Sequence, residues 1–149
     1  MRISAKEDYA IRAALELARH EGSVVKRDEV AEAQDIPIAF LENILLELKR
    51  GEIVETLRGP DGGVRLARPA REISVADVIR AVTGPLASVR GVRPPAIAYS
   101  ESAEPLREVW VALRANIRSI LEHVSLADLA SGRLPAAVTR ITRNADSWE

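Results

Sequence analysis

The residues best suited to do chemistry lie in a glycine-rich turn near the middle of this 149-residue chain. The turn reads Arg58-Gly-Pro-Asp-Gly-Gly-Val-Arg65 and joins two short stretches rich in β-branched residues. Residues 56–71 contain four arginines and one acid, a local charge of +3 in a chain of net charge -1. An arginine on a thin tip fits the minor groove of DNA, whose narrow walls concentrate negative potential. The alternatives are an ordinary hairpin turn and, less well matched, a nucleotide phosphate loop, which would need a following Gly-Lys-Ser/Thr and a helix.

A second set of candidates lies on a predicted helix over 37–50. Five apolar residues recur there at spacings of three and four, which predicts one buried face; they are Ile38, Leu41, Ile44, Leu45 and Leu48. Other side chains suit base edges, because Asn43 can pair with adenine, Glu42 can accept from cytosine, and Ala39 or Phe40 can touch a thymine methyl. The alternative is a solvated helix face, since residues 25–55 hold eight acids and four basic residues.

Enzyme chemistry finds little support in the residue types. The chain has no cysteine, so it offers no thiolate nucleophile, disulfide or cysteine-ligated cluster. Its two histidines, His20 and His123, are far apart and show no metal-ligand spacing. We therefore expect no catalytic residues, no metal and no cofactor.

The elements that must position the candidate residues follow a recognisable order. Periodic apolar residues predict helices over 6–19, 26–33 and 37–50, the last ending at Gly51 in the left-handed conformation. Residues 52–57 and 64–67 are predicted strands. Helix, short helix, turn, helix and hairpin is the order of a winged helix-turn-helix. Ser74-Val-Ala-Asp77, a capping box, then predicts a helix that stops at Gly84-Pro85.

A long helix is predicted over about 103–123, after a loop of low periodicity over 86–102. Its apolar stripe is too long for a solvated helix on so small a domain. The stripe is either core or the contact to a second copy, and dimerisation is the favoured interpretation. The residues expected to carry it are Leu106, Val109, Trp110, Leu113, Ile117, Ile120 and Leu121. A short capped helix is expected at 125–129, and residues 140–149 are expected to be weakly ordered.

Composition narrows the class of protein. An apolar fraction of 47% is ordinary for a globular chain, and only five residues are aromatic. The N-terminal residues are charged and lack the apolar stretch of a signal peptide, and no segment approaches the length of a membrane span. The expectation is a cytoplasmic protein without a membrane partner.

These motifs together resemble the Rrf2 family of bacterial transcription regulators, which includes iron–sulfur and nitric-oxide sensors. The resemblance spans most of the chain and is carried by the opening residues 1–18, by 36–45, the turn 58–67, the segment 73–84, Trp110 and 125–129. It implies a dimeric winged helix-turn-helix with a long crossing dimerisation helix. It also implies roles in DNA binding, for Ile38, Ala39, Phe40, Glu42 and Asn43 in the major groove and for Arg58 with Gly59 in the minor groove.

The chain also departs from the family pattern. Val64 stands where an aromatic residue is usual, and Thr83-Gly84 replaces the common Glu-Gly. Cluster-binding members carry three cysteines in or just beyond the loop after Pro85, whereas residues 88–104 here have none. Asp8 occupies the position of a carboxylate ligand in some members, and without thiolates it is expected to be a helix residue only. Clusterless members exist, some tied to sulfur or cysteine metabolism.

The sequence thus predicts a mainly α protein with a small β-hairpin, a winged helix-turn-helix plus a long dimerisation helix. The expected units are a DNA-binding domain (1–85), a cysteine-free loop (86–102), the dimerisation and short capped helices (103–132) and a C-terminal tail (133–149). The predicted function is a homodimeric regulator of double-stranded DNA, acting as a repressor on a palindromic operator; an effector, if there is one, is a metabolite or protein. The alternative is a protein-interaction module that has lost DNA binding, which the acidity of residues 25–55 supports.

Overall fold

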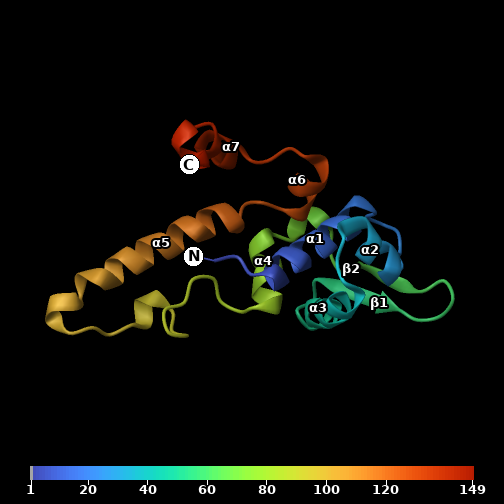
Figure 1. The fold of residues 1–149 in the computed structure, drawn as a ribbon, viewed down its shortest axis with the longest axis horizontal. Coiled ribbons are helices and arrows are strands. Elements are labelled where there is room, and N and C mark those ends of the chain that lie inside the picture. Colours follow the sequence, from blue (N-terminus) through green and yellow to red (C-terminus); the bar gives the residue numbers. More distant parts are fainter. Residues whose placement is uncertain (1) are drawn as a thin grey trace.

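The computed structural model describes residues 2–149 and confirms the mainly α class with one small hairpin (Figure 1). Its α-helices are α1 (Ala5–Arg19), α2 (Arg27–Gln34), α3 (Ile38–Arg50), α4 (Val75–Val82), α5 (Pro105–Leu121), α6 (Leu126–Ser131) and α7 (Ala136–Thr142). The strands β1 (Val54–Leu57) and β2 (Gly63–Leu66) pair antiparallel; β1 is shorter than predicted and β2 begins and ends one residue earlier. Helices α1–α4, the hairpin and α6 share a core, and we call this part the head.

Helix α1 runs through the centre of the head because its buried face is built of small residues. Ser4 and Glu7 form a capping box that satisfies backbone N–H groups at its start. Ala10, Ala13 and Ala14 are fully buried, so helices α3, α4 and α6 can approach its backbone closely. Leu17 completes the apolar face that the alanine spacing predicts.

The turn between α2 and α3 fixes the angle at which α3 leaves the core. Asp35 adopts a left-handed conformation (φ 51°), and Pro37 is the N-cap of α3. Leu41, Leu45 and Leu48 are buried as predicted, whereas Ile38 is 42% exposed. The expectation that Ile38 belongs to the buried stripe is therefore wrong, because the first turn of α3 extends beyond the helices that cover the rest.

Gly51 ends α3 for a different reason from the one predicted. Its φ is -82°, so it is not the left-handed residue; Glu52 takes that role at φ 58°. A Cβ on Gly51 would lie 2.6 Å from the Cβ of Ala81 in α4, a distance that real side chains do not reach. The glycine is thus needed for the close approach of α3 to α4.

Two further capping boxes start α4 and α6 where the sequence places them. Ser74 caps α4 with Asp77, and Ser125 caps α6 with Asp128. The two caps also lie side by side, since residues 74 and 125 form an isolated β-bridge. Leu126 is fully buried in the same core as α1 and α3, so the head includes α6, which follows the long helix in sequence.

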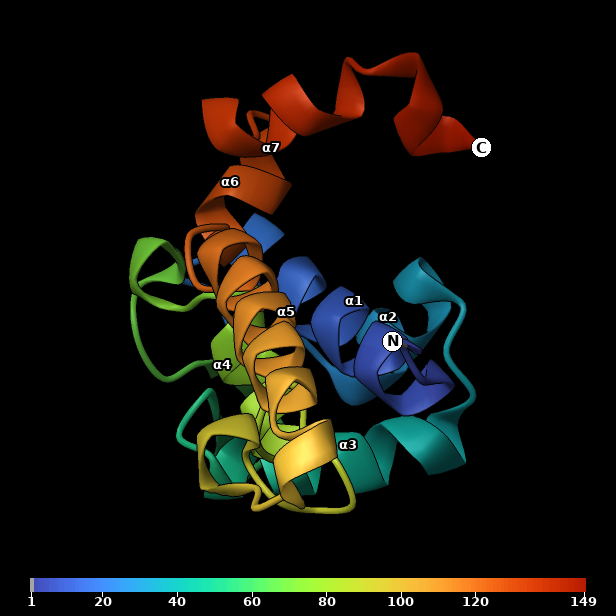
Figure 2. The same ribbon diagram turned by 90° about the vertical axis from the view of Figure 1, so that its left-hand side faces the viewer.

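Residues 86–104 run outward from the head, and α5 returns beside them toward it (Figure 1). That segment contains 3-10 helices at Pro94–Ala96 and Glu101–Ala103, and α5 begins at Pro105, later than predicted. Only the C-terminal half of α5 meets the head, where Ile117 and Leu121 pack against a second cluster around Val75 and Ile79. Figure 2 shows α5 lying along the α4 side of the head.

The last residues do not match their expectation of weak order. Pro135 is the N-cap of α7, and a 3-10 helix follows at Ala145–Trp148. Helix α7 lies beyond α6 and over the end of α5 in Figure 1, with Val138 packed against the second cluster. A proline followed by helix-forming alanines is a start signal that the sequence prediction passed over.

Candidate nucleic-acid interface

The first two turns of α3 leave every candidate base-reading residue accessible. Ile38, Ala39, Phe40, Glu42 and Asn43 are all exposed, while the opposite face of the same helix is buried. Asn43 donates only a long 3.5 Å hydrogen bond from its Nδ2 to the carbonyl of Ala39, so its amide is free to meet a partner. The N-terminal half of α3 therefore offers side chains to a ligand and the C-terminal half holds the helix in place.

Phe40 is exposed, and residues of α1 support one side of its ring. Its ring lies 6.3 Å from the ring of Tyr9 at a tilted angle of 52°. The guanidinium of Arg12 lies 5.0 Å from the centre of the Tyr9 ring, a cation–π contact, and its Nε donates to Asp8 at 2.9 Å. Asp8 lies in the first turn of α1, as the sequence predicted, and its ion pair with Arg12 adds to this support.

The turn between β1 and β2 requires glycines at its tip. Gly59 has φ +97°, and a Cβ on Gly62 would lie 2.2 Å from the carbonyl oxygen of Leu57. Val64 anchors the hairpin to the head, since it exchanges two 2.8 Å backbone hydrogen bonds with Val25 and is fully buried. Arg58 and Gly59 lie in the exposed part of this turn, which projects from the head in Figure 1.

The positive charge of the hairpin is more localised than the sequence count indicates. Arg65 pairs with Glu55 directly across the two strands, an acid just outside the counted segment. Arg68 donates from Nη1 to the carbonyl of Glu72 at 3.0 Å. Arg58 is not among the arginines that form ion pairs within residues 2–149. It is therefore the cation of the hairpin best placed to meet an anionic ligand.

Two basic residues beside the turn were not among the predicted site residues. Lys26, at the start of α2, donates from Nζ to the carbonyl of Pro60 at 2.5 Å. Lys26 and Arg27 line a small hollow with Asp28, Gly59 and Gly62, so two further cations and one acid lie against the turn. The pattern alone could not place them there, because 34 residues separate Lys26 from Pro60.

Helix α5 exposes the stripe that was predicted for dimerisation. None of its 17 residues is buried, and Leu106, Val109 and Leu113 are exposed by 39–55%. Trp110, Ile117, Ile120 and Leu121 are half-buried, with the indole N–H of Trp110 donating to the hydroxyl of Tyr99 at 3.1 Å. Ile117 and Leu121 pack against the second cluster of the head, whereas Leu106, Val109 and Leu113 lie outside the core of this chain.

Residues 86–104 offer no donor set for an iron–sulfur cluster. The chain has no cysteine, and in residues 2–149 no three histidine, aspartate or glutamate side chains converge as metal ligands. Thiolates are the ligands that such clusters require, so the residues present do not fit one. None of the helices in residues 2–149 combines the length and hydropathy that a membrane crossing requires.

Known proteins share this arrangement. The sequence profile of the Rrf2 family, described as an iron-dependent transcriptional regulator, matches residues 3–132. One relative is the HTH-type transcriptional regulator Rv1287 of Mycobacterium tuberculosis (strain H37Rv). It is 49% identical over 142 residues, which cover 95% of this chain and 88% of Rv1287. The HTH-type regulator CymR of Bacillus subtilis is 29% identical over 133 residues, covering 88% and 91% of the two chains.

Solved structures agree with these sequence relatives. The structure of CymR, titled the global cysteine regulator of B. subtilis, has a TM-score of 0.76 at 26% identity, covering 88% of this chain and 97% of that one. IscR of T. potens has a TM-score of 0.72 at 29% identity, covering 89% and 88%. These relatives are transcription regulators and not enzymes. The chain belongs to the Rrf2 family of helix-turn-helix transcription regulators.

Proposed function

We propose that this chain is a homodimeric repressor that binds a palindromic operator without an iron–sulfur cluster. The observation that carries the proposal is the unburied apolar stripe of α5, on a chain whose α3 and hairpin tip are both free to meet DNA. As a regulator of bacterial DNA it would act in the cytoplasm, and it would repress by occupying a promoter.

The stripe supports a two-fold dimer. Apolar surface of this extent is costly in water, at about 25 cal/mol for each Å² left exposed. A second α5 would cover the stripe with the same residues, because a two-fold interface is self-complementary. Such a dimer places two heads on one face of the duplex, which calls for a palindrome with half-sites about one helical turn apart or a multiple of it.

Two elements of the head, α3 and the β1–β2 hairpin, would contact DNA. The first turns of α3 would enter the major groove, with Asn43, Glu42 and Phe40 facing base edges. Arg58 would enter the flanking minor groove, with Lys26 and Arg27 beside it for the phosphates. Because α3 carries glutamates, affinity would depend strongly on the hairpin and on the pairing of two heads.

Genes of sulfur or cysteine metabolism are the regulon we propose. The support is the similarity to CymR, which is described as the global cysteine regulator of B. subtilis. Site selection from random DNA, followed by mapping of the enriched sequence onto the genome, tests the operator and the regulon together. Enrichment of a palindrome supports the proposal, and absence of any enriched sequence would instead favour an interaction module.

Arg58→Ala tests the role of the hairpin tip. We expect about a 10- to 100-fold loss of operator affinity, corresponding to about 1–3 kcal/mol, with relaxed preference at A·T-rich flanks. The matched control is Arg65→Ala in the same hairpin, whose charge Glu55 already neutralises. Titrations by fluorescence anisotropy at equal salt measure both. Equal affinities of the two variants would remove Arg58 from the proposed interface.

A further inference from the structure

Four arginines surround a hollow between the head and α5. Arg80 comes from α4, Arg93 from the segment after it, and Arg114 and Arg118 from α5, with residues 84–86 completing the lining. The volume is about 540 Å³. We call this feature the arginine hollow; its size is in the range of small-molecule sites, and it is larger than a bare inorganic anion needs.

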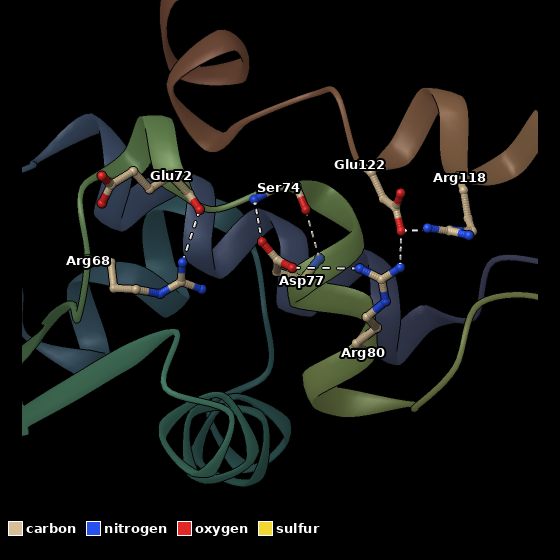
Figure 3. A network of polar contacts seen from close by, with 7 residues as sticks. All are labelled: Arg68, Glu72, Ser74, Asp77, Arg80, Arg118 and Glu122. Atoms are coloured by element: carbon tan, nitrogen blue, oxygen red, sulfur yellow. Dashed lines mark hydrogen bonds and ion pairs between the residues drawn. The ribbon is translucent and has the colours of Figure 1, made fainter.

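The charges of the hollow are only partly compensated. Glu122 accepts hydrogen bonds from Arg118, at 2.9 Å, and from Arg80, as Figure 3 shows. Asp77 adds an ion pair to Arg80 at 3.7 Å. Four guanidinium groups and these two carboxylates leave a local charge of +2, although the whole chain has a net charge of -1. Like charges gathered in one place are unfavourable unless an anion joins them.

Arg114 supplies a second, independent sign of a missing partner. Its Nε is buried and has no hydrogen-bond acceptor. Buried donors without an acceptor are rare in folded proteins, so Arg114 lacks a partner that the chain itself does not supply. Neither Arg114 nor Arg93 belongs to an ion pair within the described residues, so no carboxylate there compensates these two guanidinium charges.

The hollow lies apart from the surface that is proposed to meet DNA, since none of its lining residues comes from α3 or the β1–β2 hairpin. On α5, Arg114 lies four residues after Trp110 and three before Ile117, so it borders the apolar stripe. A ligand could therefore occupy the hollow while the proposed DNA surface stays accessible.

We propose that the arginine hollow binds a small oxyanion, the sulfate or phosphate group of a metabolite, as a regulatory ligand. Guanidinium forks suit such groups because each can donate two parallel hydrogen bonds to the oxygens. The ligand would join α4 of the head to α5 and thereby fix the angle between the two. The binding step stands without the proposed function, whereas its effect on operator binding rests on it.

Binding is tested first without DNA. The full-length protein is titrated with inorganic sulfate and with inorganic phosphate at constant ionic strength, using calorimetry and the Nε–Hε NMR signals of arginine. We expect saturable binding that shifts the Arg114 signal, with acetate and chloride giving none. Arg114→Ala and Arg93→Ala should each weaken binding at least about tenfold, or about 1.4 kcal/mol. Arg114→Lys should bind more weakly than wild type, because it keeps the charge but loses the fork.

Arg107→Ala is the control, because it removes a charge from the same helix outside the hollow. Arg107 already pairs with Glu104, and its loss should leave sulfate and phosphate affinity unchanged. An equal loss in the control and in Arg114→Ala would reduce the effect to general charge and overturn the proposal. So would the absence of a shift at Arg114 in the wild type.

The regulatory effect is tested second. Saturating anion at constant ionic strength should change the operator affinity of the wild type and not that of Arg114→Ala. If the anion binds but operator affinity stays the same, the site stands and its regulatory role fails. If no free anion binds, yet Arg114→Ala lowers the salt dependence of DNA binding, the hollow is a contact for DNA phosphates and the proposal is overturned.

Discussion

Helices α3 and α5 carry apolar stripes of similar spacing, yet the chain buries only one of them. In α3, Leu41, Ile44, Leu45 and Leu48 are all at most 3% exposed. In α5, no residue is buried at all. The reason is what surrounds each helix, since α3 packs among α1, α2, α4 and β1. The main contacts of α5 are with α4 and two short 3-10 helices, and only its last turns pack against the second cluster. The stripe on α3 is thus covered within the chain, and the uncovered part of the stripe on α5 is what the proposed dimer would bury.

The largest effect is expected from a charged residue placed in the α5 stripe. Val109→Glu should dissociate the dimer and lower operator affinity at least about 100-fold. Two copies of an apolar contact would be lost, each worth about 1.5–3 kcal/mol, and two carboxylates would face burial. Sedimentation velocity measures the first effect and titration of operator DNA the second.

Val111→Glu is the matched control for this change. It introduces the same substitution at another exposed valine of α5, about 200° further around the helix. We expect it to leave the dimer intact. Dissociation by Val111→Glu alone would place the interface on the wrong face, and a dimer that survives both changes would assign it to another element.

Substitutions in the buried stripe of α3 should lower the free energy of unfolding and leave the oligomeric state unchanged. Leu48→Ala removes a fully buried side chain and should cost about 2–5 kcal/mol of unfolding free energy. Leu46→Ala, on the exposed side of the same helix, should change stability by about 0.5 kcal/mol or less. Urea denaturation at one protein concentration compares them. Similar costs at the two positions would mean that Leu46 is also covered, by a partner chain.

Local signals in the sequence predicted most of the fold. The capping boxes at Ser74 and Ser125 mark helix starts because a cap involves residues only three apart. The reason for Gly51 could not be predicted, since the Cβ that it avoids belongs to Ala81, thirty residues later. Spacing identified the stripe of α5 and left two interpretations open, core or contact to a second copy, because burial depends on which elements lie near it.

The sequence predicted which residues make up the candidate site, but only part of what surrounds them in the fold. Arg58 and the first turns of α3 were identified because their chemistry is local. The pairing of Arg65 with Glu55 depends on strand register, and the support of Phe40 by Tyr9 depends on how α1 crosses α3. Both are properties of the folded chain, so the count of +3 overstated the charge that the hairpin can offer.

The smallest expected effect concerns the polar contact that joins α5 to its own head. Hydrogen bonds from Arg118 and then Arg80 lower the pKa of Glu122 from 4.5 to about 2. Because this pKa is depressed in the folded state, the contribution to stability is present above pH 4.5 and is lost as pH falls toward 2. Glu122→Gln should therefore be less stable than wild type at neutral pH, with the difference shrinking across that window.

The expected loss of stability is small because the side chain of Glu122 is accessible to water. Urea denaturation at a series of pH values measures it, and Glu108→Gln, elsewhere on α5, controls for the loss of a charge. A difference that stays constant down to pH 2 would show that Glu122 does not tie α5 to α4 through its charge.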